Sequence, residues 1–343
     1  MKQHLNTLYV LTQGAYVSKD SETIVVRVED EVRARIPALT IGGVVCFGQV
    51  SCSSPLLGFC GEKGITVTYL SEHGRFLARV EGPTRGNVLL RREQYRWADS
   101  PDRTREVALS VVAAKIANSR AVVLRSIRDR PDGAGNEALN AAATSLGALL
   151  LDLEGRVDVD SVRGVEGAAA KSYFDAFDAL ISQQKEDFRF SGRSRRPPLD
   201  RVNALLSFVY TLLLHDYRSA VETIGLDPAV GFLHRERPGR PSLALDLMEE
   251  LRPWFADRLV LSLVNLKQLE AASFETAASG AVLLTESGRK TVLAAYQKRK
   301  QEEIVHPFLG EKTTVGLVPQ LQALLLSRRI RGELDDYPSF FWK

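Results

Sequence analysis

The chain has 343 residues, with 45 Lys+Arg against 42 Asp+Glu, a net charge of +3 and 45% hydrophobic residues. This length predicts about two domains, and the 25% charged and 8% aromatic residues exclude a disordered, collagen-like or low-complexity chain. No apolar run reaches the ~18 residues of a membrane span and no signal peptide is evident, so we expect a cytoplasmic protein without a membrane partner.

The first eighty residues have the composition of β structure. Short runs rich in Val, Ile, Tyr and Thr alternate with turn-prone pieces, and a short helix is expected at 54–61. Strands are predicted at 7–11, 23–28, 43–47, 65–70 and 76–80. The three cysteines, Cys46, Cys52 and Cys60, are an odd number at spacings that match no common zinc site, so we expect reduced, buried small hydrophobes.

The hydrophobic period changes from two to about 3.6 near residue 102. Asp200 is a predicted cap of a long apolar helix, and Ser242 is a predicted cap of a helix that bends near Pro253. Helices are predicted at 104–128, 137–153, 165–181, 201–224, 242–253, 287–303 and 316–329. The expected fold is therefore α+β with two domains: a β-strand-rich domain at 1–82, a linker at 83–101, and a larger all-α domain at 102–343.

A scattered set of possible metal ligands lies in the predicted helical domain. Glu166 begins one helix, His234 lies in a Gly/Pro-rich loop, and Asp246 and Glu249 stand three apart on the next helix, which places both on one side. Carboxylates with one imidazole suit Mn²⁺ or Mg²⁺, which can polarise a phosphate. No phosphate-binding GxxxxGK[ST] loop, HExxH, GxSxG or paired CxxC motif is present.

Each of these residues also has an ordinary structural interpretation. Glu166 suits the first turn of a helix, His234 can bond its own loop, and a pair of acids can simply form a solvated helix face. Basic residues gather in two places, and a charged loop is commonly an exposed surface. The basic candidates for DNA binding are Arg189, Arg193, Arg195, Arg196, Lys298, Arg299 and Lys300.

The helical half resembles a known family, the CRISPR-associated adaptation integrases, written here as the Cas-one family. The resemblance is carried by segments in the family's order: VEGAA at 165–169, YF at 173–174, NALLSF at 203–208, GLDP at 225–228, GFLH at 231–234, SLALDLMEELRP at 242–253 and LTESGRK at 284–290. The ending DYPSFFWK at 336–343 resembles the subtype I-C branch. The β-then-helical organisation also resembles the fold of this family.

The resemblance implies a metal site and a reaction. Glu166, His234 and Glu249 fall on the family's metal-ligand and catalytic positions, with Asp246 as an acid that orients the site or shares the metal. The implied cofactor is Mn²⁺ or Mg²⁺. The implied reaction is phosphoryl transfer, in which the 3′-hydroxyl of a short foreign DNA fragment attacks a phosphodiester at a CRISPR repeat; a neutral histidine ligand implies lower activity at mildly acidic pH.

The resemblance also implies partners: DNA, a second copy of the chain, a dimer of the small Cas-two protein, and the Cas-four nuclease. The β-domain is then expected to mediate dimerisation. Two other classes of function stay open, namely a non-enzymatic DNA-binding scaffold and a general metal-dependent nuclease without integration.

Overall fold

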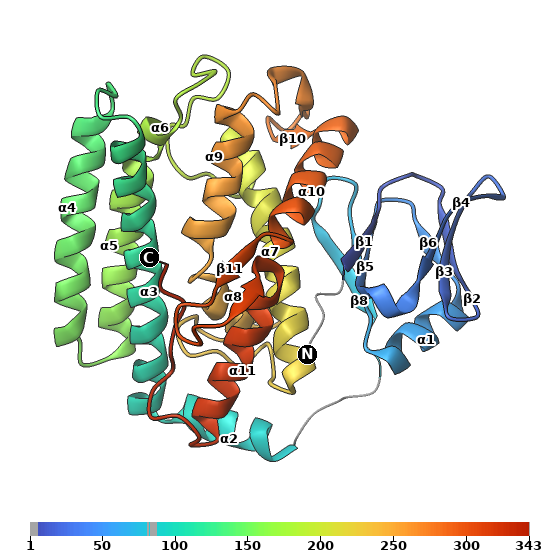
Figure 1. Cartoon of the computed structure of the whole chain (residues 1–343), viewed down its shortest axis with the longest axis horizontal. Coiled ribbons are helices and arrows are strands. Elements are labelled where there is room, and N and C mark those ends of the chain that lie inside the picture. Colours follow the sequence, from blue (N-terminus) through green and yellow to red (C-terminus); the bar gives the residue numbers. More distant parts are fainter. Residues whose placement is uncertain (1–5, 81, 83–87, 343) are drawn as a thin grey trace. The chain divides into compact units, whose positions relative to one another are not determined.

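The computed structural model describes residues 6–80, 82 and 88–342. The chain divides into two compact units, one made of residues 1–85 with 296–298 and the other of residues 86–295 with 299–343. A β-sheet unit is thus followed by a mostly helical unit, as predicted (Figure 1). The second unit is not all-α, because two short two-stranded sheets lie within residues 274–314.

The N-terminal unit contains two four-stranded sheets. In the first, β1 (Asn6–Val10), β5 (Ile41–Phe47) and β7 (Thr66–Leu70) run parallel, and β8 (Phe76–Val80) joins β7 antiparallel. The second has the order β4 (Glu31–Pro37), β3 (Thr23–Val28), β2 (Tyr16–Asp20), β6 (Ser51–Cys52). Strands β2, β4 and β6 were not predicted, because β4 and the end of β2 are rich in exposed charged residues and β6 is only two residues long.

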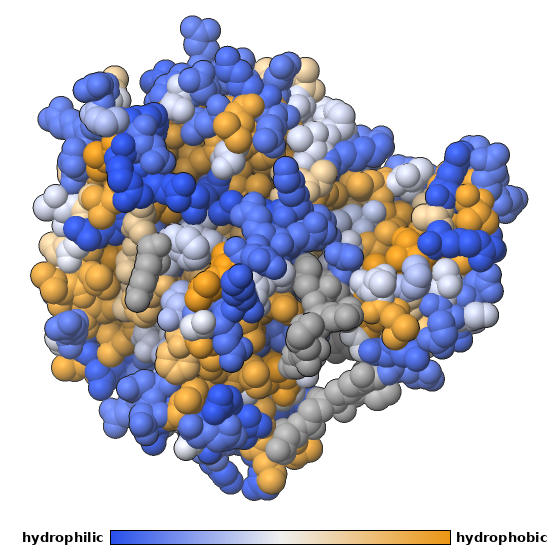
Figure 2. Space-filling model, viewed as in Figure 1, coloured by the Kyte–Doolittle hydropathy of each residue, from blue (hydrophilic) through white to orange (hydrophobic). Residues whose placement is uncertain are grey.

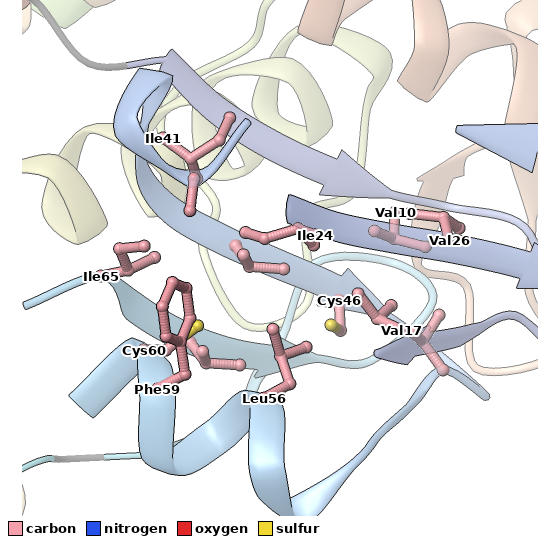
Figure 3. Close-up of a cluster of buried hydrophobic side chains, with 14 of the residues drawn as sticks. Val10, Val17, Ile24, Val26, Ile41, Cys46, Leu56, Phe59, Cys60 and Ile65 are labelled. Carbon is pink, nitrogen blue, oxygen red and sulfur yellow. The ribbon is translucent and has the colours of Figure 1, made fainter. Parts of the chain in front are cut away.

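Residues of both sheets and of helix α1 (Ser54–Lys63) share one core. Figure 3 shows side chains such as Ile24 and Ile41 from the strands close to Leu56 and Phe59 of α1. Burial of such side chains stabilises the fold by roughly 1.5–3 kcal/mol each. Cys46 and Cys60 are buried in this core and Cys52 is partly buried, and all three are free of disulfide bonds.

In the helical unit, α3 (Pro101–Asp129), α4 (Asn136–Asp152) and α5 (Val159–Asp175) pack side by side (Figure 1). Among the described residues, α3 is the single helix that is long and apolar enough to cross a membrane by length and composition. Lys115 and Arg120 interrupt its apolar run, so the sequence shows no unbroken apolar stretch there. Core helices of soluble proteins share this property, and 56% of the apolar window of α3 is buried. Hydrophilic and hydrophobic residues are interspersed over the face shown in Figure 2.

Helix α7 (Arg201–Ile224) begins and ends as its sequence predicts. The Asp200 carboxylate accepts a hydrogen bond from the Asn203 backbone N–H at 2.7 Å, and Gly225 ends the helix at φ 96°. Helix α7 packs against α8 (Ser242–Met248) and α11 (Val318–Ile330). The predicted cap at Ser242 is wrong, because α8 begins after Pro241 and Ser242 is a buried residue of its first turn.

The segment predicted as a linker contains helix α2 (Val88–Asp99), while residues 83–87 lie outside the described part of the chain. Its buried face is narrow, with Leu90, Gln94 and Trp97 separated by polar residues, so its average composition resembles a linker. Helix α5 also begins earlier than predicted, because Asp158 caps it through the Ser161 N–H. The remaining elements are η1 (Ala38–Thr40), η2 (Leu153–Gly155), α6 (Phe177–Leu180), η3 (Arg252–Asp257, a π-helical turn), α9 (Arg258–Asn265), η4 (Ala271–Ser273), β9 (Phe274–Thr276), β10 (Val282–Leu284), α10 (Glu286–Lys300), β11 (Glu303–Val305), β12 (Lys312–Thr314) and η5 (Val315–Leu317).

Candidate active site

Two carboxylates from different elements share one ammonium group. Glu166 lies on α5, Glu249 directly follows α8, and Lys115 projects from α3. The Lys115 Nζ contacts Glu166 Oε1 and lies 2.7 Å from Glu249 Oε2. Burial would lower the pKa of Lys115, but the charges of Glu249 and Glu166 outweigh it and raise this pKa. Lys115 therefore remains a cation between the two acids.

Glu249 is a buried anion, with only 2% of its side chain exposed. Its Oε1 accepts from Arg252 Nη1 at 2.6 Å, and Arg252 stands three residues later in η3. Burial alone would raise the pKa of Glu249, but the charges of Arg252, Lys115 and His234 lower it to about 2. The carboxylate is therefore ionised throughout the physiological range, and two cations fix its orientation.

Asp246 organises the loop that carries His234. Its Oδ2 accepts from the backbone N–H of Phe232 at 2.6 Å and of Leu233 at 3.0 Å. Its Oδ1 accepts from the His234 N–H at 2.9 Å and lies 2.7 Å from His234 Nδ1. A carboxylate at Nδ1 favours the tautomer that leaves the Nε2 lone pair available. Nε2 lies 3.8 Å from Glu249 Oε1 and hence faces the carboxylate pair.

Neighbouring elements hold this loop from both sides. The Gln94 amide on α2 donates to the backbone oxygens of Asp227 and Val230, both at 2.8 Å. From α5, Arg163 Nε donates to Leu233 O at 2.6 Å, one helical turn before Glu166. Gly231 lets the loop approach α8, because a Cβ there would lie 2.6 Å from an oxygen of Asp246.

The structure brings together the four acidic and imidazole residues that the sequence singled out, namely Glu166, His234, Asp246 and Glu249. Sequence reasoning missed Lys115 and Arg252 as members of the site. Arg252 carried a local signal, since it stands three residues after Glu249 on a predicted helix. Lys115 carried none, because its acidic partners lie at least 51 residues away along the chain.

Three of the seven basic candidates for DNA binding are engaged inside the protein. Arg193 donates to Asn203 Oδ1 at 2.6 Å, and burial lowers its pKa. Lys300 is buried and lies 2.9 Å from an Asp216 carboxylate oxygen. Arg299 lies mostly buried over the Trp254 ring, at 5.6 Å from its centroid. These side chains stabilise their own surroundings and are not free surface cations. The other four candidates are exposed: Arg189, Arg195, Arg196 and Lys298.

The donor set fits a divalent cation, although within the described part of the chain no three His, Cys, Asp or Glu side chains already form a metal-ligating cluster. Glu166 and Glu249 converge on one positive charge, the Lys115 ammonium, and an oriented imidazole nitrogen faces the same carboxylate. Two carboxylates and one imidazole suit Mn²⁺ or Mg²⁺.

Comparison with known proteins decides the family. Residues 8–298 match the family model described as "CRISPR associated protein Cas1". The chain belongs to the Cas1 family. It is 54% identical, over the full length of both chains, to CRISPR-associated endonuclease Cas1 1 of Chlorobaculum tepidum. It is 52% identical, again over the full length of both, to CRISPR-associated endonuclease Cas1 2 of Rhodospirillum rubrum. Both of these relatives are named as CRISPR-associated endonucleases.

Solved structures agree with the fold. A Cas1 protein from Thermotoga maritima superposes with a TM-score of 0.82 at 24% identity, covering 96% of this chain and 97% of that one. A casposase bound to an integration product superposes with a TM-score of 0.84 at 22% identity, covering 99% of this chain and 95% of that one. At these identities the likeness establishes the Cas1 fold of this chain and no more.

Proposed function

We propose that this Cas1 protein is a metal-dependent DNA endonuclease and integrase, which joins the 3′-hydroxyl ends of short foreign DNA fragments into a CRISPR array. The observation that carries the proposal is the convergence of Glu166 and Glu249 on the Lys115 ammonium, with His234 Nε2 3.8 Å from Glu249 Oε1. Relatives named as CRISPR-associated endonucleases and the shared fold with a casposase bound to an integration product support it.

Glu166, Glu249 and His234 Nε2 would hold Mn²⁺ or Mg²⁺, with Asp246 fixing the imidazole from behind. A divalent cation bound there would offset the negative charge that develops on the phosphate oxygens during substitution at phosphorus. Loading would require the Lys115 ammonium to leave its position between the two carboxylates, because two cations cannot share it.

The chain's own residues keep the donors ready for that role. Glu249 needs no deprotonation at neutral pH, since its pKa is about 2. Arg252 holds its Oε1 from one side, so the carboxylate cannot rotate freely. Once displaced, the Lys115 ammonium would remain within reach of the site and could pair with a phosphate oxygen of the DNA.

The joining step exchanges one phosphodiester for another. The 3′-oxygen of the fragment forms a new P–O bond, and the P–O bond to the 3′-oxygen of the repeat strand breaks. The proton of the attacking hydroxyl passes to solvent, and the departing oxygen is protonated in turn. The number of phosphodiester bonds does not change, so the reaction needs no nucleotide energy source. Replacing the attacking hydroxyl with water gives hydrolysis, the endonuclease activity, at the same site.

We also propose a homodimer that works with a Cas2 protein and with a Cas4 nuclease. A solved complex described as Cas6-RT-Cas1–Cas2 contains a chain with this fold, of which the present chain spans 36%. A Cas4/Cas1 fusion of Geobacter sulfurreducens is 36% identical over 342 residues, and the present chain spans 60% of it. The sequence at 336–343 supports assignment to subtype I-C. The exposed Arg189, Arg195, Arg196 and Lys298 remain candidates for contact with the DNA backbone.

A strand-joining assay tests the proposal. The protein and its Cas2 partner are incubated with a labelled fragment that has 3′-hydroxyl ends and with a supercoiled plasmid that carries the repeat. We expect label to enter the plasmid only when Mn²⁺ or Mg²⁺ is present. The Glu249→Ala variant should not join the fragment to the plasmid. The matched control is Glu286→Ala, which removes an exposed acid on α10 that pairs with the exposed Lys290 and should leave joining unchanged.

The same assay separates the rival functions. A fragment ending in a 3′-deoxynucleotide should not be joined, because it lacks the attacking oxygen. Plasmid cleavage without any joining would favour a general nuclease. DNA binding with no reaction, equal in the wild type and Glu249→Ala, would favour a scaffold and overturn the proposal.

A further inference from the structure

The segment that follows α11, residues 333–342 and here called the C-terminal tail, returns to the middle of α3 (Figure 1). Tyr337 and Phe340 are buried there, although the tail contains no helix or strand. A buried irregular segment needs partners for its polar groups. Those partners are side chains next to the candidate active site.

Glu250, adjacent to Glu249, binds the tail with both carboxylate oxygens. Its Oε1 accepts from Tyr337 Oη at 2.6 Å, and its Oε2 accepts from the Phe340 N–H at 2.8 Å. Gln322 of α11 donates to the same Oε2 at 2.8 Å and to Tyr337 Oη at 3.0 Å. Both carboxylate oxygens of Glu250 therefore accept hydrogen bonds, and these bonds fix the direction of its side chain.

Asn118 makes the second connection, one helical turn after Lys115 on α3. Its Nδ2 donates to the backbone oxygens of Glu250 and Phe340, both at 2.8 Å. Its Oδ1 accepts from the Trp342 N–H at 2.8 Å. A single buried side chain therefore joins α3, the backbone that follows Glu249, and the tail.

Aromatic packing continues the connection into η3. The Trp254 ring lies 5.3 Å from Phe340 and 4.5 Å from Trp342, measured between centroids. Trp254 stands two residues after Arg252, which holds Glu249. The tail thus contacts the two elements that supply the closest charged partners of Glu249: α3 with Lys115, and η3 with Arg252.

We propose that the C-terminal tail is a positioning element of the active site, which sets the separation between Lys115 on α3 and Glu249 by clamping Asn118 and Glu250. None of its residues touches the reacting atoms. For its catalytic consequence this inference rests on the proposed function. A tail that is loosened should let Glu249 shift relative to α3, and hence relative to Glu166 on α5, which packs against α3. Loss of this support should weaken the binding of a divalent cation by about tenfold.

The test uses Tyr337→Phe, which keeps the ring and removes both hydrogen bonds of the hydroxyl. The control is Val123→Ala, a buried substitution on α3 whose side chain points about 140° around the helix axis from that of Asn118. The first readout is backbone hydrogen exchange of the whole protein without metal. We expect residues 249–252 to exchange about tenfold faster in Tyr337→Phe than in the wild type, and to be unchanged in Val123→Ala. Equal exchange in Tyr337→Phe and wild type would overturn the inference.

The second readout is the Mn²⁺ concentration that gives half-maximal strand joining, together with Mn²⁺ affinity by calorimetry without DNA. We expect both to weaken about tenfold in Tyr337→Phe, with the joining rate at saturating Mn²⁺ within about twofold of wild type. An equal loss of affinity in Val123→Ala would show general destabilisation and overturn the positioning role. If wild type bound no Mn²⁺ while exchange still responded to Tyr337→Phe, the proposed metal-dependent function would fail and the positioning role would stand.

Discussion

Replacing Glu249 with glutamine should destabilise the helical unit by about 3 kcal/mol at pH 7. The pKa of this carboxyl falls from its ordinary 4.5 to about 2, a difference of about 2.5 units, and each unit corresponds to about 1.4 kcal/mol. Glutamine preserves the shape but leaves Lys115 and Arg252 as two buried cations with less compensation. Measured losses for breaking buried ion pairs, about 3–5 kcal/mol, have the same size.

The sign of the pH dependence gives a sharper check. Because the folded-state pKa is lowered, the stabilisation is fully present above about pH 4.5 and is lost as the pH falls through about 2. The difference in unfolding free energy between wild type and Glu249→Gln should therefore shrink, at pH 3, to less than half of its value at pH 7. Urea unfolding followed by tryptophan fluorescence measures it, since Trp97, Trp254 and Trp342 all lie in the helical unit.

The control for this experiment is Glu286→Gln, whose exposed ion pair with Lys290 should contribute less than about 1 kcal/mol. If Glu249→Gln were as stable as wild type at pH 7, or if its deficit did not change with pH, the charge-pairing argument would be refuted.

Three further substitutions and one control test the site and the elements around it. Lys115→Met should lower the melting temperature of the metal-free protein. It should also enlarge the increase in melting temperature on adding Mn²⁺, because no ammonium must be displaced from the site. Equal increases in wild type and variant in a thermal-shift assay would contradict this. Burial raises the pKa of Asp257 from 3.8 to about 6, so its contribution to stability is present below about pH 3.8 and lost as the pH rises through 6. Between pH 4 and pH 8, the free energy of unfolding of wild type should therefore fall by up to about 3 kcal/mol more than that of Asp257→Asn, as measured by urea unfolding. Parallel pH curves for the two proteins would exclude this. Gly231→Ala should cost about 1–3 kcal/mol in unfolding free energy, because its Cβ would lie 2.6 Å from Asp246 Oδ2. Gly164→Ala on α5, where a Cβ meets nothing within 4 Å, should instead be neutral or stabilising, and a similar loss in both variants would rule out the steric explanation.

The sequence predicted those elements whose hydrophobic period is strong. Helices α3 and α7 lie where a 3.6-residue period ran without interruption, and the carboxylate of Asp200 caps α7 as expected. Helix α2 was assigned to a linker because its buried face is narrow and one of its buried residues, Gln94, is polar. That glutamine is buried because it satisfies backbone groups of a loop more than 130 residues away, which no local pattern reports.

The candidate site was predictable in its acids and histidine but not in its cations. The order of the motifs singled out Glu166, His234 and Glu249, and helical spacing placed Asp246 beside Glu249. Lys115 lies in the mostly apolar middle of α3, without an acidic residue near it in sequence, so its role follows only from the packing of α3 against α5 and α8. Conversely, Lys300 belongs to a basic cluster in sequence but is buried and paired with Asp216 in the fold.

The π-helical turn η3 has a consequence for the length of the chain between α8 and α9. A π turn contains one residue more than an α turn. Arg252 at the start of η3 pairs with Glu249, and Asp257 at its end accepts from Tyr210 Oη at 2.6 Å. Removing one residue between them would rotate every later side chain of α9 by about 100° around the helix axis. The apolar face of α9 would then leave the core. The number of residues in this turn is therefore constrained independently of their identity, and a one-residue deletion should be far more damaging than any single substitution of the residues it contains.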